Sequence, residues 1–186
     1  MKLYIGNMVG IRCKIVVKEE LATLGISATS MELGEVNLEA ALSSLQFEQF
    51  RAALQKSGLE LLEDRKDILI QRIKITIINL THYSEATLTV NLSAYLSQKL
   101  SYDYTYLSNL FSEMQGMTIK HFHILNKIER VKELLLYHDL TLTEIAYKMG
   151  YSSLGHLSTQ FKKITGMTVS DFKLLEAKPR SALDFL

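Results

Sequence analysis

Two sixteen-residue stretches decide the fold of this chain: LSNLFSEMQGMTIKHF at residues 107–122 and LSTQFKKITGMTVSDF at residues 157–172. They stand fifty residues apart in the same register without a gap, and Leu, Ser, Phe, Gly, Met, Thr and the final Phe coincide. Self-similarity at a fixed spacing indicates one supersecondary unit that is used twice. Two copies are too few for a solenoid, so the repeat predicts a pair of matched units.

The whole chain has the composition of a globular, helix-rich protein. Its 186 residues are 47% hydrophobic and 22% charged, with one proline, and they suit one large domain or two small ones. The net charge of +1 gives no bulk signal for nucleic acid or membrane, so such binding must come from a local patch. The single cysteine excludes an intramolecular disulfide. No apolar run approaches the ~18 residues of a membrane span and a signal peptide is lacking, so we expect a cytoplasmic protein that binds no membrane.

The first 63 residues change hydrophobic period quickly, which is typical of a small α+β domain. We expect strands at 2–6, 27–33, 34–39 and 59–64 and amphipathic helices at 12–25 and 43–58. The second helix carries Leu45, Phe47, Phe50 and Leu54 on its expected buried face. The β-α-β-β-α-β order predicts a ferredoxin-like domain over residues 1–63, with both helices on one face of a four-stranded antiparallel sheet.

Residues 64–84 form an isoleucine-rich segment whose pattern suits a helix or a strand. Its length favours a linker helix with a stripe of Ile70, Ile73, Ile77 and Leu80 and with Asp64 or Asp67 near its start. Such a stripe would be buried either against the next domain or against a second copy of the protein. A homodimer is therefore one of two explanations for this segment.

Residues 85–176 have helical patterns throughout and precede a short tail at 177–186. In the second copy of the repeat, Thr141–Glu144 is a capping box that opens a helix, and Gly150 ends that helix. Ser152 or Ser153 can cap the next helix, and Asn91 is the matching cap at the start of the first copy. A short helix, a tight turn and a longer amphipathic helix predict a helix-turn-helix in each copy, within an all-α domain.

The second helix of each unit has a buried stripe and a polar outer face. The stripes are Leu107, Phe111 and Met114 in the first copy and Leu157, Phe161 and Ile164 in the second. On the outer faces, small hydrogen-bonding side chains suit base edges and lysines suit phosphates, although a plain solvated face is the alternative for either helix alone. The candidate DNA contacts are Asp103, Tyr104, Thr105, Ser108, Asn109 and Ser112 in the first copy and Ser152, Ser153, Gly155, His156, Ser158, Thr159, Lys162 and Lys163 in the second. For His156 a partly buried position beside Leu157 is an equal alternative.

The segment between the two units, residues 119–140, predicts a helical spacer with Ile124, Ile128, Val131 and Leu135 on one side. About eighteen helical residues at ~1.5 Å each span about 27 Å. This length suits two reading helices about one DNA turn, ~34 Å, apart on one face of the duplex. Four cations are then expected to contact the DNA backbone: Lys127, Arg130, Lys132 and Lys148.

Residues 88–175 resemble the DNA-binding domain of the AraC/XylS family of transcription regulators, above all in LTEIAYKMGYSSLGHLSTQFKKITGMTVSDF at residues 142–172. The resemblance implies double-stranded DNA and RNA polymerase as partners and makes 152–163 a reading helix. It also implies that Ala146, Gly150, Phe161 and Gly166 pack the second helix-turn-helix. Arginine is frequent in the family where Thr159 and Asn109 stand, and proline where Tyr104, Ile119 and Val169 stand. These departures bear on base preference rather than on the fold.

Met8 and Cys13 lie between the first expected strand and the first expected helix. This loop resembles the Met-x-Cys-x-x-Cys loop of heavy-metal-associated domains, in which two thiolates hold a soft ion such as Cu(I). Gly10 stands here in place of the first cysteine, so a metal at Cys13 would need a second ligand from Met8, a partner chain or a small thiol. Three interpretations stay open for Cys13: an inert thiol, a ligand shared across a dimer, and a thiol activated by the helix start and Arg12 or Lys14.

Together these patterns predict a non-enzymatic, sequence-specific DNA-binding transcription regulator with an N-terminal sensory or interaction domain. The alternative comes from a different class: a metal- or thiol-handling protein whose helical half mediates protein contacts. An enzyme is the least favoured class, because the sequence has no Ser/His/Asp, paired-carboxylate or phosphate-loop constellation. The five histidines support no metal site by their spacing.

Overall fold

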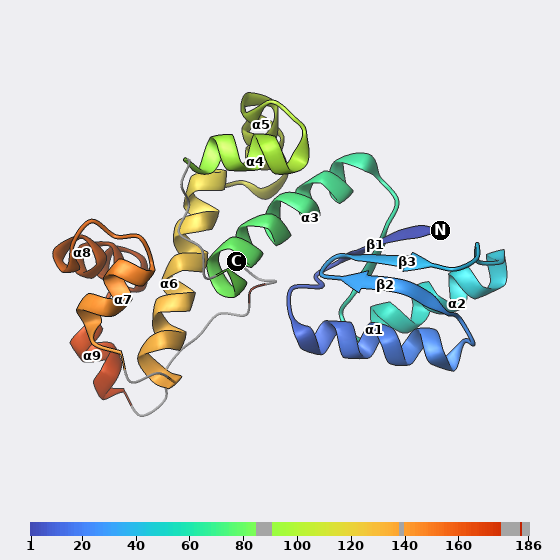
Figure 1. Cartoon of the computed structure of the whole chain (residues 1–186), viewed down its shortest axis with the longest axis horizontal. Helices are drawn as coiled ribbons and strands as arrows, with labels where there is room; N and C mark the ends of the chain where they lie inside the picture. Colours follow the sequence, from blue (N-terminus) through green and yellow to red (C-terminus); the bar gives the residue numbers. More distant parts are fainter. Residues whose placement is uncertain (85–90, 138–139, 176–182, 184–186) are drawn as a thin grey trace. The chain divides into compact units, whose positions relative to one another are not determined.

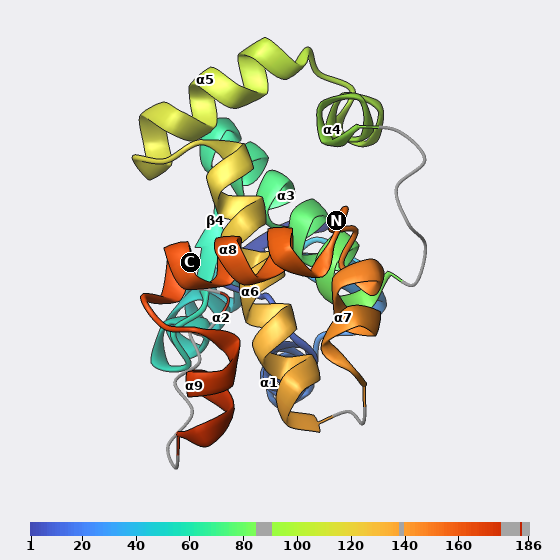
Figure 2. The same cartoon turned by 90° about the vertical axis from the view of Figure 1, so that its left-hand side faces the viewer.

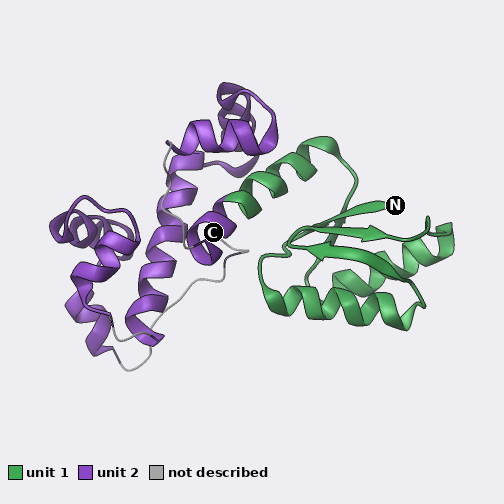
Figure 3. Cartoon of the chain, viewed as in Figure 1, with its two compact units in different colours: residues 1–76 green, residues 77–186 purple. Residues whose placement is uncertain are grey.

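The computed structural model describes residues 1–84, 91–137, 140–175 and 183. It divides the chain into two compact units, residues 1–76 and 77–186 (Figure 3). Apart from residue 183, the tail expected at 177–186 lies outside the described residues. Among the described segments, no helix has the length and apolar character that a bilayer crossing needs.

The first unit contains a four-stranded antiparallel sheet with α1 and α2 on one face (Figure 1). The strand order is β2-β3-β1-β4, and Leu3 of β1 pairs with Val36 of β3 while Ile5 pairs with Leu61 of β4. The expected element order and the antiparallel sheet are therefore confirmed. The elements are β1 (Lys2–Gly6), α1 (Ile11–Thr23), β2 (Ala28–Glu32), β3 (Glu35–Leu38), α2 (Ser44–Lys56) and β4 (Glu60–Leu62).

The core of this unit lies between the sheet and its two helices. Alternate strand residues such as Leu3, Ile5 and Val36 point inward to meet Phe50 and Leu54 of α2. The expectation that Leu45 shares this buried face is wrong, because its side chain is 69% exposed. The reason is helical phase, since five residues at about 100° each place Leu45 roughly 140° away from Phe50.

The ambiguous segment is helical: α3 (Arg65–Ile78) continues into a π-helical turn, η1 (Asn79–Tyr83). Asp64 begins α3 by accepting a hydrogen bond from the backbone N–H of Lys66 at 2.7 Å. Ile75 of α3 lies against the turn between β2 and β3, where a Cβ added to Gly34 would stand 2.2 Å from its Cδ1 atom. Gly34 has φ of +74°, so both its backbone and its surroundings favour glycine. The predicted stripe is buried at its three isoleucines, Ile70, Ile73 and Ile77.

The second unit is helical, and α6 runs between the pair α4–α5 and the pair α7–α8 (Figure 1). α6 contacts α5, α7 and α8, and Figure 2 shows α8 crossing it. α6 also contacts η1, where His82 Nδ1 lies 3.5 Å from Glu133 Oε2. The elements are α4 (Leu92–Leu100), α5 (Tyr104–Gln115), α6 (Ile119–Tyr137), α7 (Leu142–Lys148), α8 (Leu154–Thr165) and α9 (Val169–Leu174).

Candidate nucleic-acid interface

Each copy of the repeat begins its helices with side-chain caps at matching positions. Asn91 caps α4 and Thr141 caps α7, while Asp103 caps α5 and Ser153 caps α8. Each cap accepts a hydrogen bond from a backbone N–H in the first turn of its helix, which these residue types favour. The matching caps stand fifty residues apart in the sequence. The same local hydrogen bonds therefore begin the helices of both helix-turn-helix units.

The shared Gly-Met-Thr has a conformational reason. Gly116 ends α5 with φ of +67° and Gly166 ends α8 with φ of +78°, in the left-handed region that glycine adopts without strain. Two residues later, Thr118 and Thr168 cap the helices that follow, each through its hydroxyl at 3.1 Å from a backbone N–H. In each copy, Gly-Met-Thr thus ends one helix and begins the next.

A phenylalanine pair fixes the core of each copy. The rings of Phe111 and Phe122 have centroids 5.5 Å apart, and those of Phe161 and Phe172 are 5.6 Å apart, both in inclined arrangements that aromatic pairs favour. All four side chains are fully buried. The four coinciding phenylalanines therefore hold α5 against α6 and α8 against α9.

The outer face of α8 is polar and accessible. Leu157 and Phe161 are buried as expected, and Ile164 is half-buried. Lys162 and Lys163 lie in the last turn, where the helix dipole also favours positive charge. The candidate contacts are exposed at Ser152, Ser153, Gly155, His156, Thr159, Lys162 and Lys163, and half-buried at Ser158.

His156 is held by two neighbours at the start of α8. Its Nδ1 atom lies 3.2 Å from Ser152 Oγ, and its ring meets the Tyr151 ring edge-to-face at 5.2 Å. The alternative of a partly buried His156 is wrong, because the residue is exposed. Tyr151 itself is 3% exposed, and Lys127 Nζ of α6 lies 3.9 Å from the centroid of its ring. Burial lowers the pKa of Lys127 to about 8 and raises the pKa of Tyr151 to about 12.

The outer face of α5 is polar but carries no cation. Its buried side is Leu107 and Phe111, with Met114 half-buried. The helix contains no lysine or arginine, and Glu113 is exposed on it. The two reading helices thus share a core and differ in surface charge. Of the first-copy candidates, Asp103, Thr105 and Asn109 are exposed, whereas Tyr104, Ser108 and Ser112 are half-buried.

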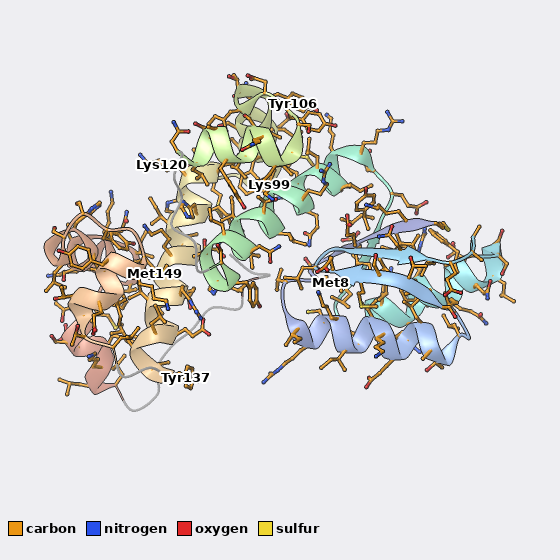
Figure 4. All side chains as sticks on the ribbon, in the orientation of Figure 1. Met8, Lys99, Tyr106, Lys120, Tyr137 and Met149 are labelled. Carbon is orange, nitrogen blue, oxygen red and sulfur yellow. The ribbon has the colours of Figure 1, made fainter. Side chains whose placement is uncertain are left out.

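An aromatic pair at the start of α5 is absent from the predicted contacts. The rings of Tyr102 and Tyr106 stack at 5.7 Å with 22° between their planes, and both residues are exposed (Tyr106 is labelled in Figure 4). Their four-residue spacing around Asp103 could have revealed them, because it places two rings together at a helix start.

Of the four cations expected to contact the DNA backbone, the three on the spacer helix α6 are not fully exposed. Lys132 is 9% exposed and pairs with Glu129 at 2.5 Å, and Arg130 pairs with Glu133 at 2.8 Å. Lys127 lies on the Tyr151 ring. The predicted contacts with the DNA backbone are therefore wrong for Lys132, which is buried, and disfavoured for Arg130 and Lys127, whose charges already have partners within the protein. Lys148, on α7, is exposed as expected.

In the first unit, Met8 and Cys13 are both drawn into the core. Met8 is fully buried (labelled in Figure 4), and Cys13 is half-buried against the same cluster with its Sγ atom 3.8 Å from the carbonyl oxygen of Asn7. No group of three or more His, Cys, Asp or Glu side chains within the described residues could hold a metal ion. This packing favours the inert interpretation of Cys13, and the metal site at Cys13 and Met8 stays a prediction.

Comparison with known proteins places the second unit in a known domain class. Residues 96–174 match the family described as a helix-turn-helix domain. An uncharacterized HTH-type transcriptional regulator of Staphylococcus aureus is 33% identical over 78 residues, covering 42% of this chain and 10% of that protein. YtdP of Bacillus subtilis, another uncharacterized HTH-type transcriptional regulator, is 24% identical over 162 residues, covering 84% of this chain and 21% of that protein. The chain thus corresponds to a small part of these longer relatives.

Two solved structures also resemble the chain. The C-terminal domain of the two-component response regulator yesN from Fusobacterium nucleatum is 29% identical, covers 55% of this chain and 98% of that chain, and gives a TM-score of 0.46. The C-terminal domain of AraT, a response regulator from Geobacillus stearothermophilus, is 25% identical, covers 63% of this chain and 97% of that chain, and gives a TM-score of 0.49. The family match spans most of α4 and all of α5 to α9, so a helix-turn-helix DNA-binding domain of the kind found in transcription regulators is present at residues 96–174.

Proposed function

We propose that this DNA-binding transcription regulator is of AraC type and reads two adjacent major-groove segments, with α5 and α8 as its reading helices. The observation that carries the proposal is the repeat itself: matching caps, glycine stops and phenylalanine pairs build two helix-turn-helix units on one spacer helix. In helix-turn-helix proteins, the second helix of each unit enters the major groove. One chain then does what a dimer of such units does, without needing a second copy.

The two helix-turn-helix units contribute unequally to DNA binding. On α8, the exposed side chains of Thr159 and His156 suit base edges, while Lys162 and Lys163 suit phosphates one turn further along. On α5, Thr105 and Asn109 offer hydrogen bonds without positive charge. We therefore assign most of the electrostatic affinity to α8 and mainly base reading to α5.

We further propose that the first unit is a ferredoxin-like sensory or interaction domain. Its strand order β2-β3-β1-β4 and its two helices on one face of the sheet are those of a split βαβ arrangement. The proposal divides the chain into this domain (1–63), a linker helix (64–84) and a DNA-binding domain (85–176). RNA polymerase as a partner, a cytoplasmic location and a non-enzymatic role belong to the same proposal. The isoleucines that offered a homodimer as one explanation are already buried within the single chain, so the proposal includes no second copy.

The test is selection of bound duplexes from a random-sequence library by the full-length protein. The expected result is a motif with two elements whose centres lie about one helical turn apart. Asn109→Ala is expected to relax the element read by α5, and Thr159→Ala the element read by α8. Ser170→Ala provides a matched control, since Ser170 is exposed on α9 and outside both candidate faces. A selected motif with a single element, or the same change of motif in all three variants, would refute the proposal that α5 and α8 each read one element.

A metal- or thiol-handling role remains as a second candidate because Cys13 is half-buried rather than fully enclosed. If this role controls DNA binding, Cu(I) or a mild oxidant should change the affinity of the wild-type protein and leave Cys13→Ser unaffected. If neither reagent changes the wild type, the inert interpretation holds. This measurement is independent of the selected motif, so the two candidates are separable.

A further inference from the structure

We propose that His156 specifies one base pair of the element read by α8, by donating a hydrogen bond from its Nε2 atom to N7 of a guanine in the major groove. The inference rests on the proposed function, because it assumes that α8 enters the groove. It adds the recognising atom, the base and the device that orients the side chain.

The position of His156 gives its ring access to the groove floor. It is the third residue of α8, and in helix-turn-helix proteins the N-terminal residues of the reading helix contact base edges. Gly155 precedes it without a side chain, and a Cβ there would meet only Ser153 Oγ at 3.9 Å. The backbone at this point can therefore approach DNA closely.

The ring of His156 is fixed before DNA arrives. Ser152 Oγ holds Nδ1 at 3.2 Å, and the Tyr151 ring supports the imidazole edge-to-face. Tyr151 is itself packed in place: it is buried, its backbone N–H donates to the carbonyl oxygen of Ala146 at 2.9 Å, and Lys127 lies on its ring. A side chain that is already ordered loses little conformational entropy on binding, which favours its use as a specificity contact.

The contact with Ser152 favours a proton on the other ring nitrogen. His156 lies in the first turn of α8, where the partial positive charge of the helix N-terminus favours a lone pair over an N–H group at Nδ1. In the proposed arrangement the serine hydroxyl donates to Nδ1, which leaves the proton of the neutral imidazole on Nε2. A fixed donor matches guanine, whose N7 and O6 are both acceptors, whereas adenine places an amino donor beside N7.

The first experiment compares wild type, His156→Ala and the control His121→Ala in the same library selection. His121 is exposed on α6 and outside the proposed contacts. His156→Ala is expected to lose the guanine preference at one position of the α8 element, with discrimination there falling roughly fivefold, as for one net hydrogen bond. Its affinity for unrelated DNA and its salt dependence should stay unchanged, because no phosphate contact is lost.

The second experiment replaces the preferred guanine by 7-deazaguanine, which lacks N7 and keeps its base pairing. Wild type is expected to bind the substituted duplex roughly fivefold more weakly, and His156→Ala to bind both duplexes equally. Ser152→Ala, which releases Nδ1, should discriminate less than wild type. Equal sensitivity of wild type and His156→Ala to the analogue overturns the inference, and so does a uniform loss of affinity with a shallower salt dependence, which would mean a phosphate contact. A wild type that selects no motif at all would instead refute the proposed function.

Discussion

Replacing Lys162 and Lys163 together by alanine is expected to make DNA binding less sensitive to salt by a calculable amount. Both side chains are exposed in the last turn of α8, and α5 carries no cation, so these two residues are the main positive charges on the reading helices. Each phosphate neutralised on duplex DNA adds about 0.9 to the slope of log affinity against log salt. Losing two contacts should therefore reduce the slope by about 1.8. If affinity at 1 M salt is unchanged, that corresponds to about 60-fold weaker binding at 0.1 M.

The assay is a fluorescence anisotropy titration of a labelled duplex at several salt concentrations. It is run on the selected site and on unrelated DNA, because a phosphate contact should be lost equally on both. The control is Lys56→Ala/Lys66→Ala, which removes the same charge from exposed positions in the first unit. Equal slopes of log affinity against log salt for wild type and the Lys162/Lys163 variant would refute the proposal that the end of α8 contacts the DNA backbone. Equal changes in variant and control would reduce the effect to net charge.

Three further outcomes concern stability. Gly34→Ala should lower the free energy of unfolding more than Gly25→Ala, which has a similar φ but open space and should cost about 1 kcal/mol, as measured by urea unfolding. Phe161→Ala and Phe111→Ala should each cost about 3–5 kcal/mol in the second unit, because both rings are fully buried; hydrogen exchange would localise the loss. Burial lowers the pKa of Lys127 from 10.5 to about 8, so the unfolded state binds more protons between these values. The wild type should then gain stability as pH rises from 8 to 10.5, and Lys127→Met should lack that gain in denaturant titrations.

Each of these expectations has a contrary result. Equal losses for the two glycine variants would mean that the helix beside the β2–β3 turn yields to the added methyl group. A cost well below 3 kcal/mol for one phenylalanine alone would mean that the two copies do not share a core of equal packing. A flat alkaline profile in the wild type would mean that the lysine on the tyrosine ring keeps its ordinary pKa.

The helix-turn-helix units could be predicted from sequence because their determinants are local. Caps such as Asn91 and Thr141, and stops such as Gly116 and Gly166, act within a few residues of where they stand. Because each cap and each stop occurs in both copies of the repeat, one copy supported the prediction made from the other. The same holds for the first unit, whose short strands and helices change period where the chain turns.

The failures concern which side of a helix the packed fold covers. Lys132 belongs to a charged run that looks solvated in the sequence, but the packing of α6 buries it beside Glu129 of the same helix. The contact between Lys127 and Tyr151 joins α6 to the turn between α7 and α8, which lies 24 residues further along the sequence. Leu45 failed for a simpler reason, since apolar residues near a helix start can satisfy an approximate pattern and still lie off phase.

The unequal charge of the two reading helices gives the molecule a direction. A dimer of identical heads must read a palindrome, so turning it end over end on the duplex changes nothing. Here a reading helix without cations and a reading helix with two lysines follow one another in fixed order on one chain. A molecule bound in the proposed way would point along the DNA, with α5 always on one side of the site and α8 on the other. Inverting the operator in place would then reverse the direction in which the bound molecule points, whereas moving the operator upstream of a promoter would keep that direction.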